Sequence, residues 1–306
     1  MKELDELIEL TEISNYYNQD INFYKDFLRK NNISYKQMIN YFSGLDHNVD
    51  RRFDFNNYYL PRKLNCGFEK LTMSNEDESY TFYVSSYQTT NAQFHSFLKH
   101  SDYKCNYKYP KNEHNHPVAW VSWHDAIAYT KWINKIFKSK LINEPSVKLS
   151  NNFKELLNDR NYQISLLSET EWLYSANSGK NITYPWGNYL SLNCCNYKTS
   201  KLEKTCPVGC YIEGVSESGL FDLSGNTWEW LRTKWGPNLN NRIYKSQTGL
   251  NDDRNNIDTE QNFLRSMKGG SFLVESKRLK INFGDAVPPE SIDDGDGLRI
   301  GLVKLL

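Results

Sequence analysis

Helical periodicity stops at Asn177, and this limits the folds that the chain can adopt. Beyond that residue the sequence offers only short strand candidates, separated by loops rich in Gly, Asn and Asp. Capped helical segments lie upstream, so helices and strands do not alternate regularly along the chain. The sequence therefore predicts an α+β domain with three modest helices and much irregular structure.

The predicted helices of the main body share one type of start signal. A Ser or Thr stands at the N-cap in each, and in two of them a Gln or Glu follows three residues later, as in a capping box. These helices begin after Thr90, Ser122 and Ser168. The helix after Ser122 also has apolar residues at the spacing of a buried stripe. Strand candidates lie at 68–73 and 81–88.

Residues 1–60 have a different texture and predict a helical N-terminal extension. The segment 20–32 carries an approximate apolar stripe. A second helix follows Ser34, with Gln37 at the capping-box position and Gly44 as a C-terminal stop. Such an extension either packs on the main domain, which is the default, or binds a partner.

The charge balance excludes several classes of partner. Lys plus Arg and Asp plus Glu both total 37, so no net field attracts nucleic acid or an anionic membrane surface. The N-terminus lacks the apolar region of a signal peptide, and no apolar run reaches membrane-spanning length. We expect a cytoplasmic protein that binds neither nucleic acid nor membranes. Aromatic residues, 14% of the chain, supply large buried area for a folded core.

Seven motifs occur in an order that resembles the formylglycine-generating enzyme, or sulfatase-modifying factor, family. They are FYVSSYQTTNAQF (82–94), HPVAWVSWHDAIAY (116–129), SLLSETEWLYSA (165–176), YPWGN (184–188), GLFDLSGNTWEW (219–230), KGGSF (268–272) and GLRIGL (297–302). The resemblance covers residues 64–306. It implies a variant of the C-type-lectin fold, with few regular elements and long ordered loops.

The resemblance also argues against the family's best-known activity. Copper-dependent formylglycine formation uses two cysteines after the Gly-Gly-Ser turn, because Cu(I) is soft and prefers thiolates. The matching positions here are Val274 and Leu279, and no cysteine follows Cys210. We therefore expect no copper, no formylglycine-generating activity and no catalytic residue at these positions.

The resemblance implies calcium sites as well. The motif DLSGNTWE matches one family site position by position, with side chains from Asp222 and Glu229 and carbonyls from Gly225 and Thr227. Calcium prefers such oxygen ligands, although a metal-free turn with capping carboxylates is the alternative. A second site would use Asn196 and Tyr197, but its acidic loop is contracted here, so this second site is doubtful.

The family pattern places a ligand groove near three residues of this chain: Trp228, Ser271 and Arg299. Trp228 is a binding surface in this interpretation, and Trp230 fills the core. The groove would hold an unknown peptide, glycan or protein ligand.

Other ligand-rich patterns allow different chemistry. Cys194, Cys195, Cys206 and Cys210 together could offer thiolates to zinc, but they lack the usual spacing and are more simply reduced thiols. His114 and His116 could contribute to a nonheme iron site. The alternative is that they are histidines of the surface or core whose ring nitrogens form ordinary hydrogen bonds. Asp293, Asp294 and Asp296 share one loop that either binds a cation or is solvated, the commoner case.

Three functions remain open on these grounds. The first is a calcium-stabilised, lectin-like binding module that has lost catalysis. The second is a divergent iron-dependent oxidative enzyme acting on a small molecule or peptide. The third, a hypervariable ligand-binding protein, ranks lowest because the segment after Gly-Gly-Ser has little Asn.

Overall fold

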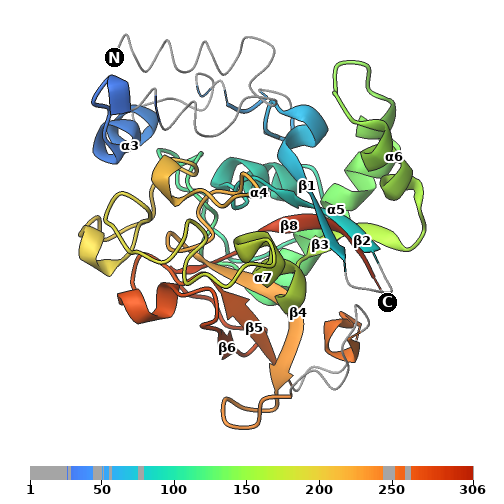
Figure 1. The fold of residues 1–306 in the computed structure, drawn as a ribbon. Helices are drawn as coiled ribbons and strands as arrows, with labels where there is room; N and C mark the ends of the chain where they lie inside the picture. Colours follow the sequence, from blue (N-terminus) through green and yellow to red (C-terminus); the bar gives the residue numbers. More distant parts are fainter. Residues whose placement is uncertain are drawn as a thin grey trace.

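A computed structural model describes residues 26, 29–43, 50, 52–54, 57–74, 79–243, 252–258 and 263–305. Two four-stranded sheets form its centre, in the strand orders β1-β2-β8-β3 and β6-β5-β4-β7. Figure 1 shows the first sheet beside α5 and α6, with β4, β5 and β6 extending away from it. Within the described residues, no helix combines the length and apolar character that a membrane span needs.

The first sheet is antiparallel and joins distant parts of the chain. Its strands are β1 (Phe68–Ser74), β2 (Ser79–Ser85), β3 (Tyr162–Leu166) and β8 (Ile300–Lys304). The C-terminal strand β8 inserts between β2 and β3, pairing Tyr83 with Leu302 and Ile164 with the same leucine. The two ends of the main domain are therefore fastened in one sheet.

The second sheet carries the residues around the predicted sites. It contains β4 (Trp228–Gly236), β5 (Leu264–Lys268), β6 (Asp285–Val287) and the two-residue β7 (Asp296–Gly297). The pair β4–β7 is parallel and brings Trp228 opposite Asp296. The loop that carries Asp293, Asp294 and Asp296, which we call the acidic loop, is thereby placed against the motif GLFDLSGNTWEW.

The two capping boxes predicted in the main body form, and a third forms at Ser122, where Asp125 is the N3 residue. Helices α4 (Asn91–Lys99), α5 (Trp123–Ser139) and α7 (Glu169–Asn177) start after Thr90, Ser122 and Ser168, each with reciprocal hydrogen bonds between the N-cap and N3 residues. A fourth helix, α6 (Asn151–Asn158), was not expected from the sequence. It starts after Ser150, whose hydroxyl accepts a hydrogen bond from the amide of Phe153.

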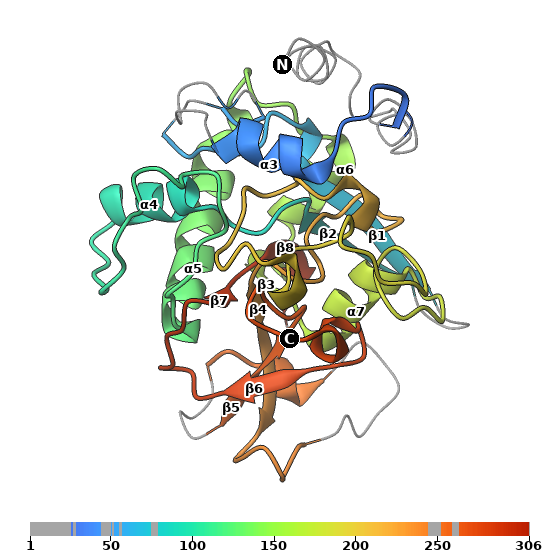
Figure 2. The same cartoon turned by 90° about the vertical axis from the view of Figure 1, so that its left-hand side faces the viewer.

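The described part of the N-terminal extension packs on the main domain. Helix α3 (Tyr35–Ser43) follows Ser34, whose hydroxyl accepts from the amide of Gln37, as predicted. Met38 and Phe42 are buried in a cluster with residues of the main body, among them Tyr87, Val208, Tyr211 and Phe221. Figure 2 shows α3 lying over this side of the body. Most of the helix predicted at 20–32, and Gly44, lie outside the described residues.

Polar contacts fasten the same junction. The side-chain amide of Asn115 donates to the carbonyl of Phe42 and to a carboxylate oxygen of Asp50, at 3.0 and 2.8 Å. Asp50 also pairs with Arg52 at 2.7 Å, and that guanidinium lies 3.6 Å from the centre of the Phe42 ring. The described residues between 29 and 62 therefore form part of the folded body.

Candidate functional site

A cavity of about 670 Å³ is the strongest candidate for a binding site. We call it the main cavity. Its walls come from the segment between α4 and α5, the loop around residue 204 and the chain near the C-terminus. The apolar part of the lining consists of the aromatic and aliphatic side chains of Tyr107, Trp120, Phe272 and Ile292. Polar lining includes Asn91, Lys108, Glu113, Glu203, Lys204 and Asp294. A volume of this size accommodates a small molecule or a few residues of a peptide.

Trp120 stands at the edge of the main cavity in an unusual conformation. Its side chain is 58% exposed, and its backbone has φ of +60°. A bulky residue in this left-handed region costs about 1–3 kcal/mol, and such strain is concentrated at functional sites. The amide of Trp120 donates to the carbonyl of Asp293 at 3.0 Å, which holds this conformation. The fold thus fixes an exposed indole beside the acidic loop.

The acidic loop forms one wall of the main cavity through Asp294. A hydrogen bond with Asp293, together with partial burial, raises the pKa of Asp294 to about 6. Burial and the nearby Asp293 and Asp294 raise the pKa of Asp296 to about 7. Among the described residues, no group of three or more His, Cys, Asp or Glu side chains is arranged to hold a metal ion, and this loop is included. Its surplus of negative charge instead favours a cationic group on a ligand.

The opposite wall is held rigidly. The hydroxyl of Tyr107 donates to the side chain of Asn91 at 2.7 Å, and the amide of Asn91 donates to the carbonyl of Glu113 at 2.7 Å. Lys204 pairs with the carboxylate of Glu113 at 3.0 Å. The Glu113 charge is thereby compensated within the protein, which leaves Asp294 and Glu203 as the acids that face a ligand.

The three residues that the family pattern assigned to a groove are buried. Ser271 and Arg299 are each 1% exposed, Trp228 is 7% exposed, and none of the three lines the main cavity. The Trp228 ring packs near Phe283, and the Ser271 hydroxyl accepts from the amide of Leu273. The neighbouring residue Phe272 does reach the cavity. The three predicted groove residues are therefore packed in the interior and do not line the main cavity.

Val274 and Leu279 lie together where the resemblance would place copper ligands. Both side chains approach Gly270, which has φ of +73°, and an added Cβ there would come within 3.1 Å of each. Leu279 is fully buried in a cluster with Tyr184, Cys195 and Tyr197. Two aliphatic side chains offer no lone pair to a soft metal, so the residues present do not fit a copper ion.

At the calcium site predicted for residues 222–229, the side chain of Gln88 lies against oxygens of the loop. The amide nitrogen of Gln88 lies 2.9 Å from the Thr227 carbonyl, 3.1 Å from the Glu229 carboxylate and 3.2 Å from the Asp222 carbonyl. The carboxylate of Asp222 accepts instead from the amide of Gly209, at 2.7 Å. Burial raises the pKa of Asp222 to about 6. Calcium at this loop stays a prediction, and the geometry does not favour it.

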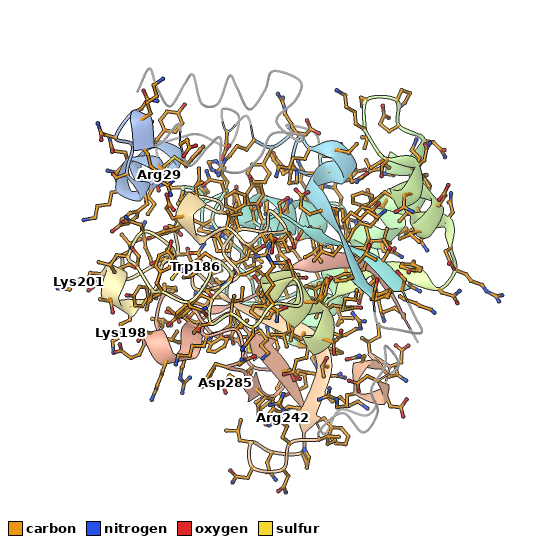
Figure 3. All side chains as sticks on the ribbon, in the orientation of Figure 1. Arg29, Trp186, Lys198, Lys201, Arg242 and Asp285 are labelled. Carbon is orange, nitrogen blue, oxygen red and sulfur yellow. The ribbon has the colours of Figure 1, made fainter. Side chains whose placement is uncertain are left out.

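The second predicted calcium site, at Asn196 and Tyr197, lies in a polar loop that also carries lysines. The side-chain amide of Asn196 donates to the carbonyl of Lys204 at 2.8 Å, and Tyr197 is mostly buried. The loop that follows carries Lys198 and Lys201, which Figure 3 shows together at one edge of the molecule. Lys198 pairs with Glu275 at 2.8 Å, and the side-chain oxygen of Asn196 is buried without a hydrogen-bond partner among the described residues, so the second calcium site stays a prediction.

The cysteines and histidines singled out in the sequence are structural. None of the six cysteines forms a disulfide, and burial raises the thiol pKa of Cys195, Cys206 and Cys210. These cysteines belong to no group of three or more His, Cys, Asp or Glu side chains arranged to hold a metal ion, as judged over the described part of the chain. Burial lowers the pKa of His116 to about 4, and its ring contacts the hydroxyl of Thr205 at 2.9 Å. Neither pattern supports the zinc or iron alternatives.

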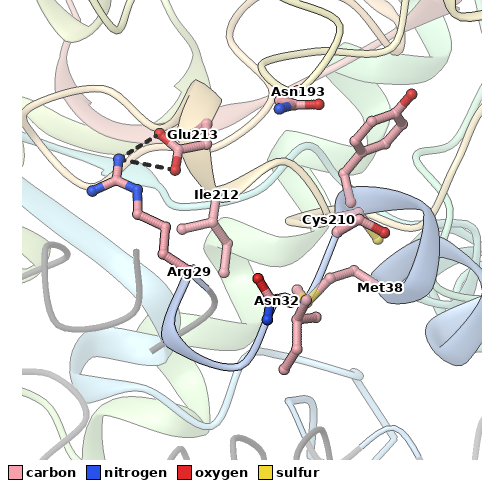
Figure 4. Close-up of a pocket in the computed structure, with 10 residues that line it drawn as sticks. Arg29, Asn32, Met38, Asn193, Cys210, Ile212 and Glu213 are labelled. Carbon is pink, nitrogen blue, oxygen red and sulfur yellow. Dashed lines mark hydrogen bonds and ion pairs between the residues drawn. The ribbon is translucent and has the colours of Figure 1, made fainter. Parts of the chain in front are cut away.

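A smaller cavity of about 350 Å³ lies where the N-terminal segment meets the body. Figure 4 shows Arg29 on one side of it, paired with Glu213, and Met38 near Cys210 on the other. Tyr35 stacks on Tyr211 at 5.0 Å between ring centres. Residues of the N-terminal segment and of the body therefore line this cavity together.

The sequence motifs do not mark Trp120 as a site residue. It lies inside the motif HPVAWVSW, but its exposure depends on backbone geometry that leaves no trace in the sequence. The three acids of the acidic loop are evident in the sequence, but their position beside Trp120 depends on the parallel pairing of β4 with β7.

Comparison with known proteins agrees with the resemblance. The family of the sulfatase-modifying factor enzyme 1-like domain matches residues 66–302. A formylglycine-generating enzyme from Thermomonospora curvata is 29% identical over 202 residues, which is 60% of this chain and 55% of that protein. The inactive Cα-formylglycine-generating enzyme 2 of Bos taurus is 30% identical over 129 residues, covering 39% of this chain and 33% of that protein. The chain thus spans about half, or less, of these curated relatives.

Solved structures show the same fold. Treponema denticola variable protein 1 has a TM-score of 0.54 at 16% identity, with 77% of this chain and 94% of that chain covered. PvdO from Pseudomonas aeruginosa has a TM-score of 0.52 at 18% identity, covering 77% and 92%. The predicted α+β fold of the C-type-lectin-like type is confirmed. The chain belongs to the family of the sulfatase-modifying factor enzyme 1-like domain.

Proposed function

We propose that this protein is a non-catalytic member of its family that binds a peptide segment with a basic side chain in the main cavity. The observation that carries the proposal is the exposed, strained Trp120 held beside Asp294. An indole face attracts a guanidinium or ammonium group, and a carboxylate nearby pairs with the same group. Together they form a recognition site for Lys or Arg.

The rest of the main cavity suits the remainder of a peptide. Phe272 and Ile292 provide apolar surface, while Asn91 and Lys108 provide donors for backbone carbonyls. Such a mixture of apolar walls and a few placed polar groups is typical of specific binding sites.

The loss of catalysis rests on the aliphatic pair Val274 and Leu279. Formylglycine formation with copper requires two thiolates at these positions in the resembling enzymes, and none is present here. The similarity to a relative named inactive is consistent with this proposal. The oxidative alternative has no observation in its favour, because His116 is buried and bound to Thr205.

The test starts from a random peptide library selected on the immobilised full chain. Fluorescence anisotropy then measures the selected peptide and a version with its Lys or Arg replaced by Gln. We expect that replacement, Trp120→Ala and Asp294→Asn each to weaken binding by about tenfold or more. Selected peptides without basic residues, or binding that ignores both variants, would contradict the proposal.

Matched controls lie outside the main cavity. Tyr189→Ala removes another exposed aromatic side chain, and Glu217→Gln removes an exposed acid. Both are expected to bind the peptide as the parent protein does. Metal analysis provides an independent check, because stoichiometric copper or iron in the purified protein would favour the enzymatic alternative.

A further inference from the structure

Gln88 occupies the space in front of two of the four predicted calcium ligands, the Thr227 carbonyl and the Glu229 carboxylate, while the carboxylate of Asp222 accepts from the amide of Gly209 instead. The side chain of Gln88 is 1% exposed, and its amide nitrogen lies within 2.9–3.2 Å of the carbonyls of Asp222 and Thr227 and the carboxylate of Glu229. Calcium would have to stand 2.3–2.6 Å from such oxygens. An amide group and a calcium ion cannot share this space.

The negative charge of Glu229 is already compensated. Arg299 donates to both carboxylate oxygens, at 2.8–3.1 Å, and the two side chains are at most 1% exposed. The indole of Trp172 donates to the second oxygen at 2.8 Å. With Gln88, four N–H groups point at one carboxylate, which has about four lone-pair positions. A divalent cation here would also be repelled by the guanidinium.

Arg299 extends the same support to the loop backbone. Its guanidinium donates to the carbonyl of Phe221 at 2.6 Å and to the carbonyl of Ser85 at 2.8 Å. Ser85 ends β2, and Gln88 follows shortly after it, so one buried cation joins this segment, the loop and the chain end. Gathering carbonyls and a carboxylate around one positive centre is what calcium does in irregular loops.

We propose that the loop 222–229 is held by protein donors, the Arg299 guanidinium and the Gln88 amide, in place of a calcium ion. The orientation of the Gln88 amide distinguishes a loop held by protein donors from a loop held by calcium. With its nitrogen inward, its two N–H groups are shared among three oxygens, and its own oxygen, Oε1, has no hydrogen-bond partner among the described residues. Turned over, it would place that oxygen among three others, an arrangement that only a cation could hold together.

The first test uses the unmodified full chain. Thermal melting is followed in excess calcium chloride and in excess EGTA, and bound calcium is measured after dialysis against a calcium-free buffer. We expect the two melting temperatures to agree within about 1 °C, with no stoichiometric calcium. A melting temperature at least about 3 °C higher in calcium, or about one calcium per chain, would overturn the proposal.

The second test converts the donor into a ligand. Gln88→Glu replaces the amide with a second carboxylate facing Glu229, so two carboxylates then share the single charge of Arg299, and the surplus negative charge should make the site unstable without a further cation and let it recover in calcium. We expect its melting temperature to rise by about 3 °C or more in calcium, and less in magnesium. Gln93→Glu is the matched control, since Glu serves the capping box of α4 equally well and should give no calcium response.

A third variant covers the case in which Gln88→Glu does not fold. Gln88→Met removes the amide and leaves the carbonyls of Asp222 and Thr227 without their donor. The proposal predicts an equal loss of stability in calcium and in EGTA. A loss confined to EGTA would mean that calcium holds the loop, and would overturn it.

Discussion

The carboxylate of Glu171 accepts hydrogen bonds from both terminal nitrogens of Arg232, at 2.6 and 2.8 Å, in the interior of the protein. The same carboxylate accepts from the amide of Ser168 and from the hydroxyl of Tyr80, each at 2.7 Å. It therefore caps α7, pairs with a residue of β4 and contacts β2 in the other sheet. One side chain links the two sheets and the helix beside them.

Replacing Glu171 by Gln should destabilise the protein strongly. The change leaves the Arg232 guanidinium buried without its counter-charge, which typically costs about 3–5 kcal/mol. Urea unfolding followed by circular dichroism measures the free energy of unfolding. Glu213→Gln is the control, because its pair with the exposed Arg29 should contribute about 1 kcal/mol or less. Equal midpoints for the two variants would contradict the role of Glu171.

Asp296→Asn should stabilise the protein at alkaline pH relative to the parent. The pKa of Asp296 is raised from 3.8 to about 7 by burial and by Asp293 and Asp294. Its contribution to stability is full below about pH 3.8 and is lost as the pH rises through 7, since folding then requires a buried charge. The asparagine cannot ionise. Its stability advantage should therefore grow by about 1–3 kcal/mol between pH 5 and pH 8.

Melting curves of the two proteins across this range measure the difference. His116, with its pKa lowered to about 4, stabilises the fold as the pH rises from 4 to 6.5, but equally in both proteins. A difference in melting temperature that stays constant with pH would show that Asp296 does not titrate near 7.

Five of the six thiols should resist modification in the folded protein. Only Cys105 is partly exposed, and the other five are buried. Burial also raises the pKa of the Cys66 thiol to about 12, so little reactive thiolate forms. Ellman's reagent should titrate at most one thiol in native buffer and six in guanidinium chloride. Rapid reaction of four thiols after addition of a chelator would instead reveal a zinc site.

Phe42→Ala should loosen the N-terminal extension. The ring is 3% exposed and lies against the Arg52 guanidinium, and removal of a buried phenyl group costs about 3–5 kcal/mol. Limited proteolysis should then cut near residue 43 faster than in the parent protein. Tyr41→Ala, on the same helix but less buried, should change the rate little. Equal cleavage of the parent and the Phe42 variant would argue that the extension is not anchored there.

Helix starts were predictable because capping is local. Ser34, Thr90, Ser122 and Ser168 each act on residues within one turn, so the signal lies in consecutive letters. The missed helix α6 carries weaker signs, since Ser150 precedes Phe153 and Leu157 but the N3 position is apolar. A short amphipathic segment of this kind is easily taken for a loop.

The contacts at the candidate sites were not predictable. Gln88 and Arg299 meet Glu229 from positions 141 and 70 residues away in the chain, and only the completed sheets bring them together. Family motifs marked Glu229 and Arg299 as important, but motif position does not reveal that one neutralises the other. Likewise the motifs do not record the packing that buries Ser271 and Trp228.

The contact of Asn115 with Asp50 separates two boundaries that are usually treated as one. The region matched by the family begins at residue 66, whereas the packed core includes residues from at least Met38 onward. The homologous region and the packed core thus have different limits in this chain. A fragment cut at the homology limit would expose Tyr87, Val208 and Phe221 to water and would become prone to self-association.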